Sequence, residues 1–174
     1  TIREFCTINR GTAQDKGVTF IGNNNWIMAY VHIAHDCHIG NECIFANATN
    51  IAGHVEVNDF AILGGFTGIH QFCKIGAHII TAVGTVVYKD IPPFIIVSGN
   101  GNNTKPNGIN IEGLKRRDFS ASSIAAIKKA YKIMYRDGNT INEALIQLKK
   151  FDEHKDEVNL FVDFINKSKR GLVR

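Results

Sequence analysis

The chain carries a repeat of six residues from Ile21 to Val87, and this repeat limits the possible folds more than any other feature. Every sixth residue in the stretch is apolar except Thr81, and the residue after each of these positions is usually glycine or alanine. A period of six rotates around an α-helix of 3.6 residues per turn, so no helix can bury such a pattern. A fixed short period is typical of a β-helix, in which each hexapeptide forms one short strand and one corner.

The composition indicates a folded protein, because 44% of the residues are hydrophobic and 21% are charged. The apolar runs are too short to span a membrane and no signal peptide is visible, so we expect a cytoplasmic location. The net charge of +4 is compatible with anionic partners such as nucleotide phosphates or an acidic carrier protein. The basic residues cluster after residue 104 without interleaved aromatics, which argues against nucleic acid as a partner.

The limits of the repeat predict two domains. A fragment of the repeat in another phase precedes a polar loop at residues 13–17, which we expect to reset the register. The pair Pro92 and Pro93 is expected to end the paired strands. We therefore predict a hexapeptide-repeat β-helix over residues 1–92, followed by a C-terminal loop and helical domain over residues 93–174. The chain starts inside repeat-like sequence without Met, so we expect that N-terminal coils, with part of any site, are missing.

Helical periodicity replaces the repeat near the C-terminus. Ser120 and Thr140 are suited to cap the first two helices, since their hydroxyls can accept hydrogen bonds from free N–H groups. A third helix carries Val158, Phe161 and Ile165 on one face. Apolar residues at this spacing predict a packed core and not a cofactor site.

The cysteines all occupy one slot of the repeat, two residues before an apolar anchor: Cys6, Cys37, Cys43 and Cys73. Alternation along a strand turns this slot inward. Cys37 and Cys73 would lie two coils apart, roughly 9–10 Å at the usual strand spacing, which is too far for a disulfide. We therefore expect buried free thiols.

Counting by eighteens predicts where polar residues meet, because three hexapeptides would close one coil. One edge then collects polar residues and one glycine from three successive coils: His32, His35, Asp36, Gly53, His54, His70 and Gln71. The other histidines, His38, His78 and His154, are expected on solvated surfaces.

This edge suits two kinds of chemistry. Two or three neutral imidazoles can hold a catalytic zinc ion. A general base needs one histidine oriented by a carboxylate, beside a backbone N–H that stabilises an anion. Asp36 next to His35, with Gly53 stacked upon the histidine, favours the general base, because glycine lets a substrate approach the backbone closely.

Segments 32–37, 52–55, 70–72 and 110–117 together resemble the acyl-[acyl-carrier-protein]–UDP-N-acetylglucosamine O-acyltransferases of lipid A biosynthesis. The similarity spans essentially the whole chain, and segment 110–117 is its most specific part. The resemblance implies a left-handed parallel β-helix followed by a small C-terminal helical domain, assembled as a homotrimer with sites between subunits. It implies transfer of a 3-hydroxyacyl group from acyl carrier protein to the 3-hydroxyl of UDP-N-acetylglucosamine, with no cofactor and no metal.

The resemblance also implies residue roles. His35 would be the general base, Asp36 would support it, and the Gly53 N–H would stabilise the tetrahedral oxyanion. The implied substrate-binding residues are His32, His54, His70, Gln71, Asn110, Glu112, Arg116 and Arg117. Val83 stands where a side chain closes the acyl groove, so we expect a medium-length acyl chain. The loop at residues 99–106 departs from the family in length and lacks a histidine often found there.

Three alternatives stay open. A hexapeptide N-acyltransferase or a small-molecule acetyltransferase is disfavoured by residues 110–117. A zinc hydratase of the carbonic anhydrase type would be revealed by stoichiometric zinc. The third alternative is a structural solenoid without enzymatic activity. If the chain is an enzyme, replacement of His35 by Ala should abolish acyl transfer and leave the fold intact.

Overall fold

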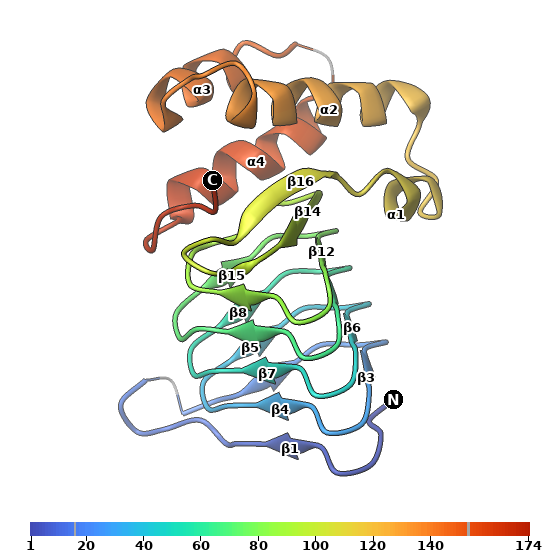
Figure 1. Ribbon diagram of the computed structural model, residues 1–174, viewed down its shortest axis with the longest axis vertical. Helices are drawn as coiled ribbons and strands as arrows, with labels where there is room; N and C mark the ends of the chain where they lie inside the picture. Colours follow the sequence, from blue (N-terminus) through green and yellow to red (C-terminus); the bar gives the residue numbers. More distant parts are fainter. Residues whose placement is uncertain (16, 153) are drawn as a thin grey trace.

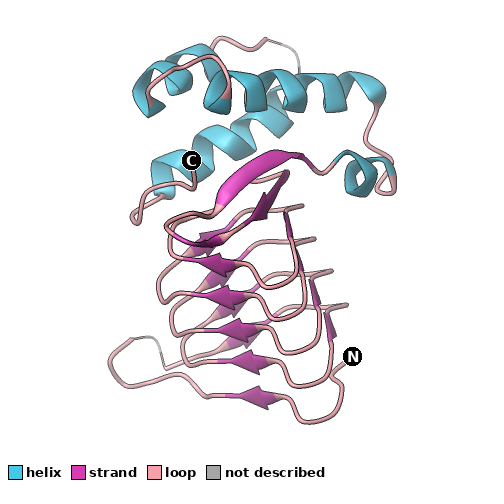
Figure 2. Ribbon diagram, viewed as in Figure 1, coloured by secondary structure: helices cyan, strands magenta, loops and turns pink. Residues whose placement is uncertain are grey.

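The computed structural model describes residues 1–15, 17–152 and 154–174 (Figure 1). Short strands stack into a three-sided solenoid, and the helices cover its C-terminal end (Figure 2). Within the coils the strands are β1 (Thr7–Ile8), β2 (Phe20–Ile21), β3 (Trp26–Ile27), β4 (His32–Ile33), β5 (His38–Ile39), β6 (Ile44–Phe45), β7 (Asn50–Ile51), β8 (Glu56–Val57), β9 (Ile62–Leu63), β10 (Gly68–Ile69), β11 (Lys74–Ile75), β12 (Ile80–Thr81) and β13 (Val86–Val87). After them come β14 (Ile95–Ser98), β15 (Asn100–Gly101) and β16 (Lys105–Ile109), then α1 (Ile111–Lys115), α2 (Ala121–Tyr135), α3 (Ile141–Leu148) and α4 (Lys155–Lys167).

The sheet topology confirms the predicted parallel β-helix. The three sheets have the strand orders β1-β4-β7-β10-β13-β15, β11-β8-β5-β2 and β16-β14-β12-β9-β6-β3. Pairing is parallel with partners 18 residues apart through most of the coils, as for His32 with Asn50. Each coil therefore contributes one short strand to each face, and each corner recurs once per coil.

The apolar ladder fills the solenoid, and its one polar member is accommodated by hydrogen bonds. Ile33, Ile51 and Leu63 are fully buried. The Thr81 hydroxyl accepts a hydrogen bond from the Gly64 N–H at 2.9 Å and lies 2.7 Å from the Thr67 hydroxyl. Burial of a polar group is costly only when it lacks partners, so Thr81 interrupts the apolar pattern without opening the core.

The cysteines are free, as the repeat predicted. Cys37, Cys43 and Cys73 are buried and Cys6 is partly buried. Burial raises the pKa of the Cys37 thiol to about 11, because the core disfavours a thiolate. The buried thiols of Cys37, Cys43 and Cys73 are therefore protonated packing groups.

The ladder continues beyond Pro93, where the sequence predicted its end. Ile91 bridges Ile75, and β14 and β15 pair in parallel with β12 and β13. Pro92 and Pro93 lie outside the strands, in the turn between Ile91 and β14. The coil is shortened before them: partners are 18 residues apart at Ile69 and Val87, and 16 apart at Ile75 and Ile91. Strand β16 then runs antiparallel to β14, which the sequence did not predict.

The helical region begins and ends largely as predicted. Ser120 accepts a hydrogen bond from the Ser123 N–H at the start of α2, and Thr140 forms a capping box with Glu143 at the start of α3. Helix α1 was not predicted. In the described part of the chain, no helix combines the length and apolar character that crossing a membrane requires. Lys16, in the predicted loop, and Glu153 lie outside the described residues.

His78 corrects one prediction, because it is 7% exposed and not on a solvated face. Its ring stacks between Phe60 at 4.7 Å and Phe94 at 5.5 Å, and it meets Phe119 edge-on at 5.2 Å. The column holding His78 is covered by residues beyond the regular repeat, so counting by eighteens could not reveal its burial. The placement of His38 is confirmed, since it is exposed in register with Glu56.

Candidate active site

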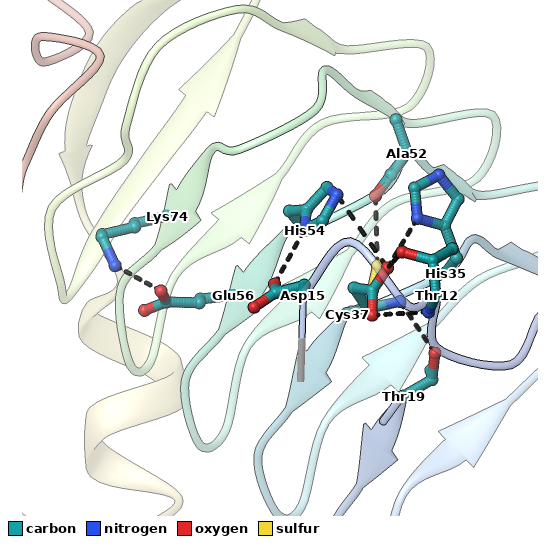
Figure 3. A network of polar contacts seen from close by, with 10 residues as sticks. Thr12, Asp15, Thr19, His35, Cys37, Ala52, His54, Glu56 and Lys74 are labelled. Atoms are coloured by element: carbon teal, nitrogen blue, oxygen red, sulfur yellow. Dashed lines mark hydrogen bonds and ion pairs between the residues drawn. The ribbon is translucent and has the colours of Figure 1, made fainter. Parts of the chain in front are cut away.

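His35 and Asp36 occupy the corner between β4 and β5, and they form the centre of the site. Figure 3 shows His35 with Thr12 and His54 nearby. His35 Nδ1 lies 2.9 Å from Asp36 Oδ2. The Asp36 side chain is 1% exposed, whereas that of His35 is 42% exposed. This contact orients the imidazole and leaves Nε2, which has no hydrogen-bond partner among the described residues, as the atom available to a substrate.

The Asp36 carboxylate is held in its ionised form. Burial acts to raise its pKa, but hydrogen bonds from Thr12 and His35 outweigh this effect and lower the pKa to about 2. Thr19 fixes the backbone, since its hydroxyl accepts a hydrogen bond from the Asp36 N–H at 2.9 Å. A buried anion beside His35 can stabilise a positive charge that forms on the imidazole during proton transfer.

Gly53 lies directly against the His35 ring, one coil further along. A Cβ atom at Gly53 would stand 2.6 Å from His35 Cε1 and 2.8 Å from Nε2, so only glycine leaves room for the imidazole. Within the described residues, the Gly53 N–H meets no hydrogen-bond acceptor. The predicted stacking of Gly53 on His35 is therefore confirmed as a contact.

His54 shares the corner with His35 and Asp36. Its ring meets the His35 ring edge-on at 5.1 Å and stacks on Phe72 at 4.6 Å. His54 Nδ1 lies 3.0 Å from Asp15 Oδ2, and Nε2 lies 3.9 Å from Asp36 Oδ2. His54 and Phe72 both have φ near +60°, so this corner repeats the same left-handed turn and stacks the side chains.

The remaining predicted residues of this edge lie beside the cluster. His32 and His70 line a hollow of about 460 Å³ together with Gly53. His32 Nδ1 lies 2.7 Å from the Thr7 hydroxyl, and His70 Nδ1 lies 3.2 Å from the Gln71 carbonyl oxygen. Gln71, which follows His70 in the chain, is exposed. Tyr88 also lines this hollow, and its ring meets the His70 ring edge-on at 5.4 Å.

A second hollow of about 760 Å³ lies on the other side of the corner. Asp36 and His54 line it together with two acidic residues, Asp15 and Glu56, and three basic ones, Lys74, Lys169 and Arg170. The His35 corner therefore stands between two hollows, one largely apolar and one charged.

The structure places the predicted residues of segment 110–117 at a different corner. Asn110 is 1% exposed and caps α1, with its amide nitrogen donating to the His78 carbonyl oxygen at 2.9 Å. This placement gives Asn110 a structural role, and its expected contact with substrate stays a prediction. Arg117 stacks over the Phe60 ring at 4.8 Å and donates to the Gly113 carbonyl oxygen.

Glu112 and Arg116 are exposed near the same corner, and Glu112 pairs with Lys115 at 3.0 Å. Val83 lies at the third corner of the solenoid, between β12 and β13, with 76% of its surface exposed. Within one chain, the predicted site residues are therefore distributed over separate corners.

Sequence reasoning missed Thr12 and Asp15, which contact the cluster from the loop before β2. The Thr12 N–H and hydroxyl both donate to the Asp36 carboxylate, at 2.9 and 2.7 Å. The sequence offered only a polar interruption of the repeat as a signal. The interruption showed where the loop lies, but it did not show that the loop contacts Asp36 and His54.

The cluster also offers possible metal ligands. One atom each from His35, Asp36 and His54 lies within 4.8 Å of the others. The Asp36 carboxylate already accepts hydrogen bonds from His35 and from two groups of Thr12. A metal ion would have to displace some of these donors, so the arrangement fits a histidine–carboxylate pair better than a ready metal site.

Comparisons with known proteins find relatives over nearly the whole length of this chain. The family described as Udp N-acetylglucosamine O-acyltransferase, Domain 2, matches residues 90–173, and the bacterial transferase hexapeptide family matches residues 19–53. The acyl-[acyl-carrier-protein]–UDP-N-acetylglucosamine O-acyltransferase of Thiobacillus denitrificans is 58% identical over 99% of this chain and 66% of that protein. The corresponding protein of Burkholderia orbicola is 49% identical over the whole chain and 67% of its own length.

Solved structures show the same relation. The UDP-N-acetylglucosamine acyltransferase of Francisella novicida superposes with a TM-score of 0.95 at 45% identity, covering 99% of this chain and 63% of that one. The enzyme from Campylobacter jejuni gives a TM-score of 0.91 at 41% identity, covering the whole chain and 68% of that one. This chain thus spans about two thirds of the length of its relatives, and it belongs to the family of acyl-[acyl-carrier-protein]–UDP-N-acetylglucosamine O-acyltransferases.

Proposed function

We propose that this chain carries the catalytic part of an O-acyltransferase of lipid A biosynthesis. The reaction would move a 3-hydroxyacyl group from acyl carrier protein to the 3-hydroxyl of UDP-N-acetylglucosamine. One observation carries the proposal: the His35–Asp36 pair, at 2.9 Å, sits against Gly53 with the imidazole Nε2 open to a substrate. Family membership supplies the substrate class, since the relatives' names state both substrates.

The geometry supports a general-base mechanism. His35 Nε2 takes the proton from the sugar hydroxyl while the oxygen attacks the thioester carbonyl carbon. Negative charge moves to the carbonyl oxygen, which the free Gly53 N–H can stabilise. The tetrahedral intermediate then collapses, the carbon–sulfur bond breaks, and the proton on His35 passes to the departing thiolate. Asp36, ionised and buried, stabilises the imidazolium between these two steps.

Two other groups are assigned to substrate binding under this proposal. His32, His70 and Gln71 line or flank the hollow beside Gly53, where an acyl chain or sugar can lie. Glu112, Arg116 and Arg117 would contact the nucleotide or phosphopantetheine, because an arginine's planar fork suits phosphate. His54 would support the first group from within the corner.

A homotrimer would unite these groups. The two sets lie at different corners of one chain, so a site between subunits can combine the His35 corner of one copy with the α1 corner of its neighbour. The third corner supports an association surface, since Phe5, Tyr30 and Phe66 are 71%, 60% and 69% exposed. Exposed aromatic rings gathered at one corner of a folded protein favour an interaction site there.

An acyl-transfer assay tests the proposed function. UDP-N-acetylglucosamine and 3-hydroxyacyl carrier protein are mixed with the protein, and thiol release is followed together with formation of the acylated sugar nucleotide. Ester formation at the 3-hydroxyl is expected. Turnover only with an acceptor that carries an amine at sugar position 3, or stoichiometric zinc in the active protein, would contradict the proposal.

Acyl-chain length is tested in the same assay with donors of increasing length. Val83 is expected to close the acyl groove, so a medium-length 3-hydroxyacyl donor should give the highest kcat/KM. Replacement Val83→Gly should shift the preference to longer donors. A wild-type preference for the longest donor would contradict the assignment of Val83.

A further inference from the structure

The loop before β2 is longer than the repeat requires. Strand β1 pairs with β4 at a separation of 25 residues, Thr7 with His32, whereas β4 pairs with β7 at 18. This corner therefore contains seven residues more than the same corner of a regular coil. An 18-residue coil closes without them, so the additional residues are not needed to complete the solenoid.

These residues bring Thr12 onto the Asp36 carboxylate. The Thr12 N–H donates to Oδ1 at 2.9 Å and its hydroxyl donates to Oδ2 at 2.7 Å (Figure 3). The same Oδ2 atom receives the His35 Nδ1–H at 2.9 Å. Two donors from one residue, aimed at both oxygens, fix the plane of the carboxylate and with it the direction in which it can accept from His35.

They also bring Asp15 onto His54. Asp15 Oδ2 lies 3.0 Å from His54 Nδ1, on the side of the ring away from Asp36. A hydrogen bond at one ring nitrogen determines which nitrogen carries the proton in a neutral histidine. Asp15 therefore places a proton on His54 Nδ1, and the stacking of His54 on Phe72 at 4.6 Å keeps the ring in this plane.

We propose that Thr12 and Asp15 are positioning residues for acyl transfer, with Thr12 aligning the Asp36 carboxylate for His35 and Asp15 setting the tautomer and orientation of His54. The loop then belongs to the site and is not a simple interruption of the repeat. This inference rests on the proposed function, because it assigns His35 as the reacting base. Neither Thr12 nor Asp15 takes a proton from the substrate.

A pair of conservative variants tests Thr12. Thr12→Val removes the hydroxyl with little change in shape and should lower kcat about tenfold, because a misaligned carboxylate misdirects the base. The KM for UDP-N-acetylglucosamine should change less than twofold. Thr12→Ser keeps the hydroxyl and should retain at least half of the wild-type kcat. Gln14→Ala, at an exposed position of the same loop, is the matched control and should leave kcat unchanged.

Imidazole ¹H–¹⁵N spectra of histidine-labelled protein test Asp15. The His54 Nδ1–H signal should be present in the wild type and should move or vanish in Asp15→Asn, with the His38 signals unchanged. Wild-type kcat in Thr12→Val, equal losses in Thr12→Val and Thr12→Ser, or an unchanged His54 signal in Asp15→Asn would overturn the inference.

The two proposals fail in distinguishable ways. Absence of acyl transfer by the wild-type protein, or wild-type turnover by His35→Ala, would refute the proposed function. In that event the spectra would still decide whether Asp15 holds His54. If the wild type catalyses acyl transfer and Thr12→Val has the same kcat, only the role of the loop is refuted.

Discussion

Among single residues, His78 is a buried histidine whose surroundings favour the uncharged form of its ring. Its Nδ1 atom is buried without a hydrogen-bond partner among the described residues. Burial, and secondarily the nearby positive charge of Arg117, lowers the pKa of His78 to about 4. The folded protein therefore binds this proton only at a pH well below that at which the unfolded chain binds it.

This difference predicts a pH-dependent stability. Between about pH 6.5 and pH 4 the unfolded chain takes up a proton on His78 that the folded chain does not, so stability falls as the pH falls. Replacement His78→Phe removes the proton and extends the stack of Phe60 and Phe94. The stability gain of the variant over the wild type should grow by about 2 kcal/mol from pH 8 to pH 5. Chemical denaturation at both pH values measures it, and an equal gain at both would contradict the account.

Gly53 carries a second prediction at this scale. Replacement Gly53→Ala puts a methyl group 2.6 Å from His35 Cε1, and the ring, which is 42% exposed, should swing outward and leave Asp36. We expect kcat to fall about 100-fold, because His35, the proposed base, is displaced from its productive position. The Tm should change little. Steady-state kinetics and thermal unfolding measure the two effects, and a stable variant with wild-type kcat would contradict the assigned contact.

At the scale of elements, Asp90 ties the C-terminal segment to the last coils of the solenoid. Its buried carboxylate accepts hydrogen bonds from the Lys74 N–H at 2.7 Å and the Ser168 hydroxyl at 2.6 Å. The Lys169 and Arg170 N–H groups reach the same carboxylate, and residue 90 also bridges Leu172. One side chain thus connects β11 with the segment after α4.

Replacement Asp90→Ala should destabilise the protein by about 3 kcal/mol, because several partly buried donors lose their acceptor. Amide hydrogen exchange should accelerate most in α4 and in residues 168–173. Asp163→Ala, at an exposed position of α4, is the matched control and should change stability by less than about 0.5 kcal/mol. Equal effects of the two replacements would contradict the role of Asp90.

The elements also show how far sequence reasoning reaches. A period of six predicted the coils, and counting by eighteens brought His35, Asp36 and Gly53 together, because regular pairing makes sequence distance a measure of spatial distance. Where the pairing is irregular, sequence distance no longer predicts which residues lie close together. The seven additional residues before β2 hid Thr12, and the shortened coil before Ile91 hid the burial of His78.

The helices illustrate the same limit. Capping residues such as Ser120 act on their own backbone neighbours, so the sequence could place them. The resemblance implied a substrate contact for Asn110, and local sequence showed no sign of its structural contacts. Its cap of α1 and its bond to the His78 carbonyl oxygen depend on a contact 32 residues away, which local pattern cannot show.

At the scale of the whole molecule, the distribution of site residues over separate corners requires association if they are to act together. We expect a trimer with three times the 19.3 kDa mass of one chain. Phe66→Asp puts a charge on the exposed aromatic corner and should yield monomers that lack acyl-transfer activity. Sedimentation equilibrium measures the mass of both proteins. A monomeric wild type with full activity would contradict assembly as a condition for catalysis.

The proposed role of His35 as the base is tested by comparing it with a neighbouring histidine. The kcat for acyl transfer is measured for wild type, His35→Ala and His38→Ala, the last being an exposed histidine three residues away on a solvated face. His35→Ala should lower kcat by at least about 100-fold at unchanged Tm, because general-base catalysis contributes a factor of this size or more. His38→Ala should keep wild-type kcat. Equal turnover by all three proteins would contradict the account.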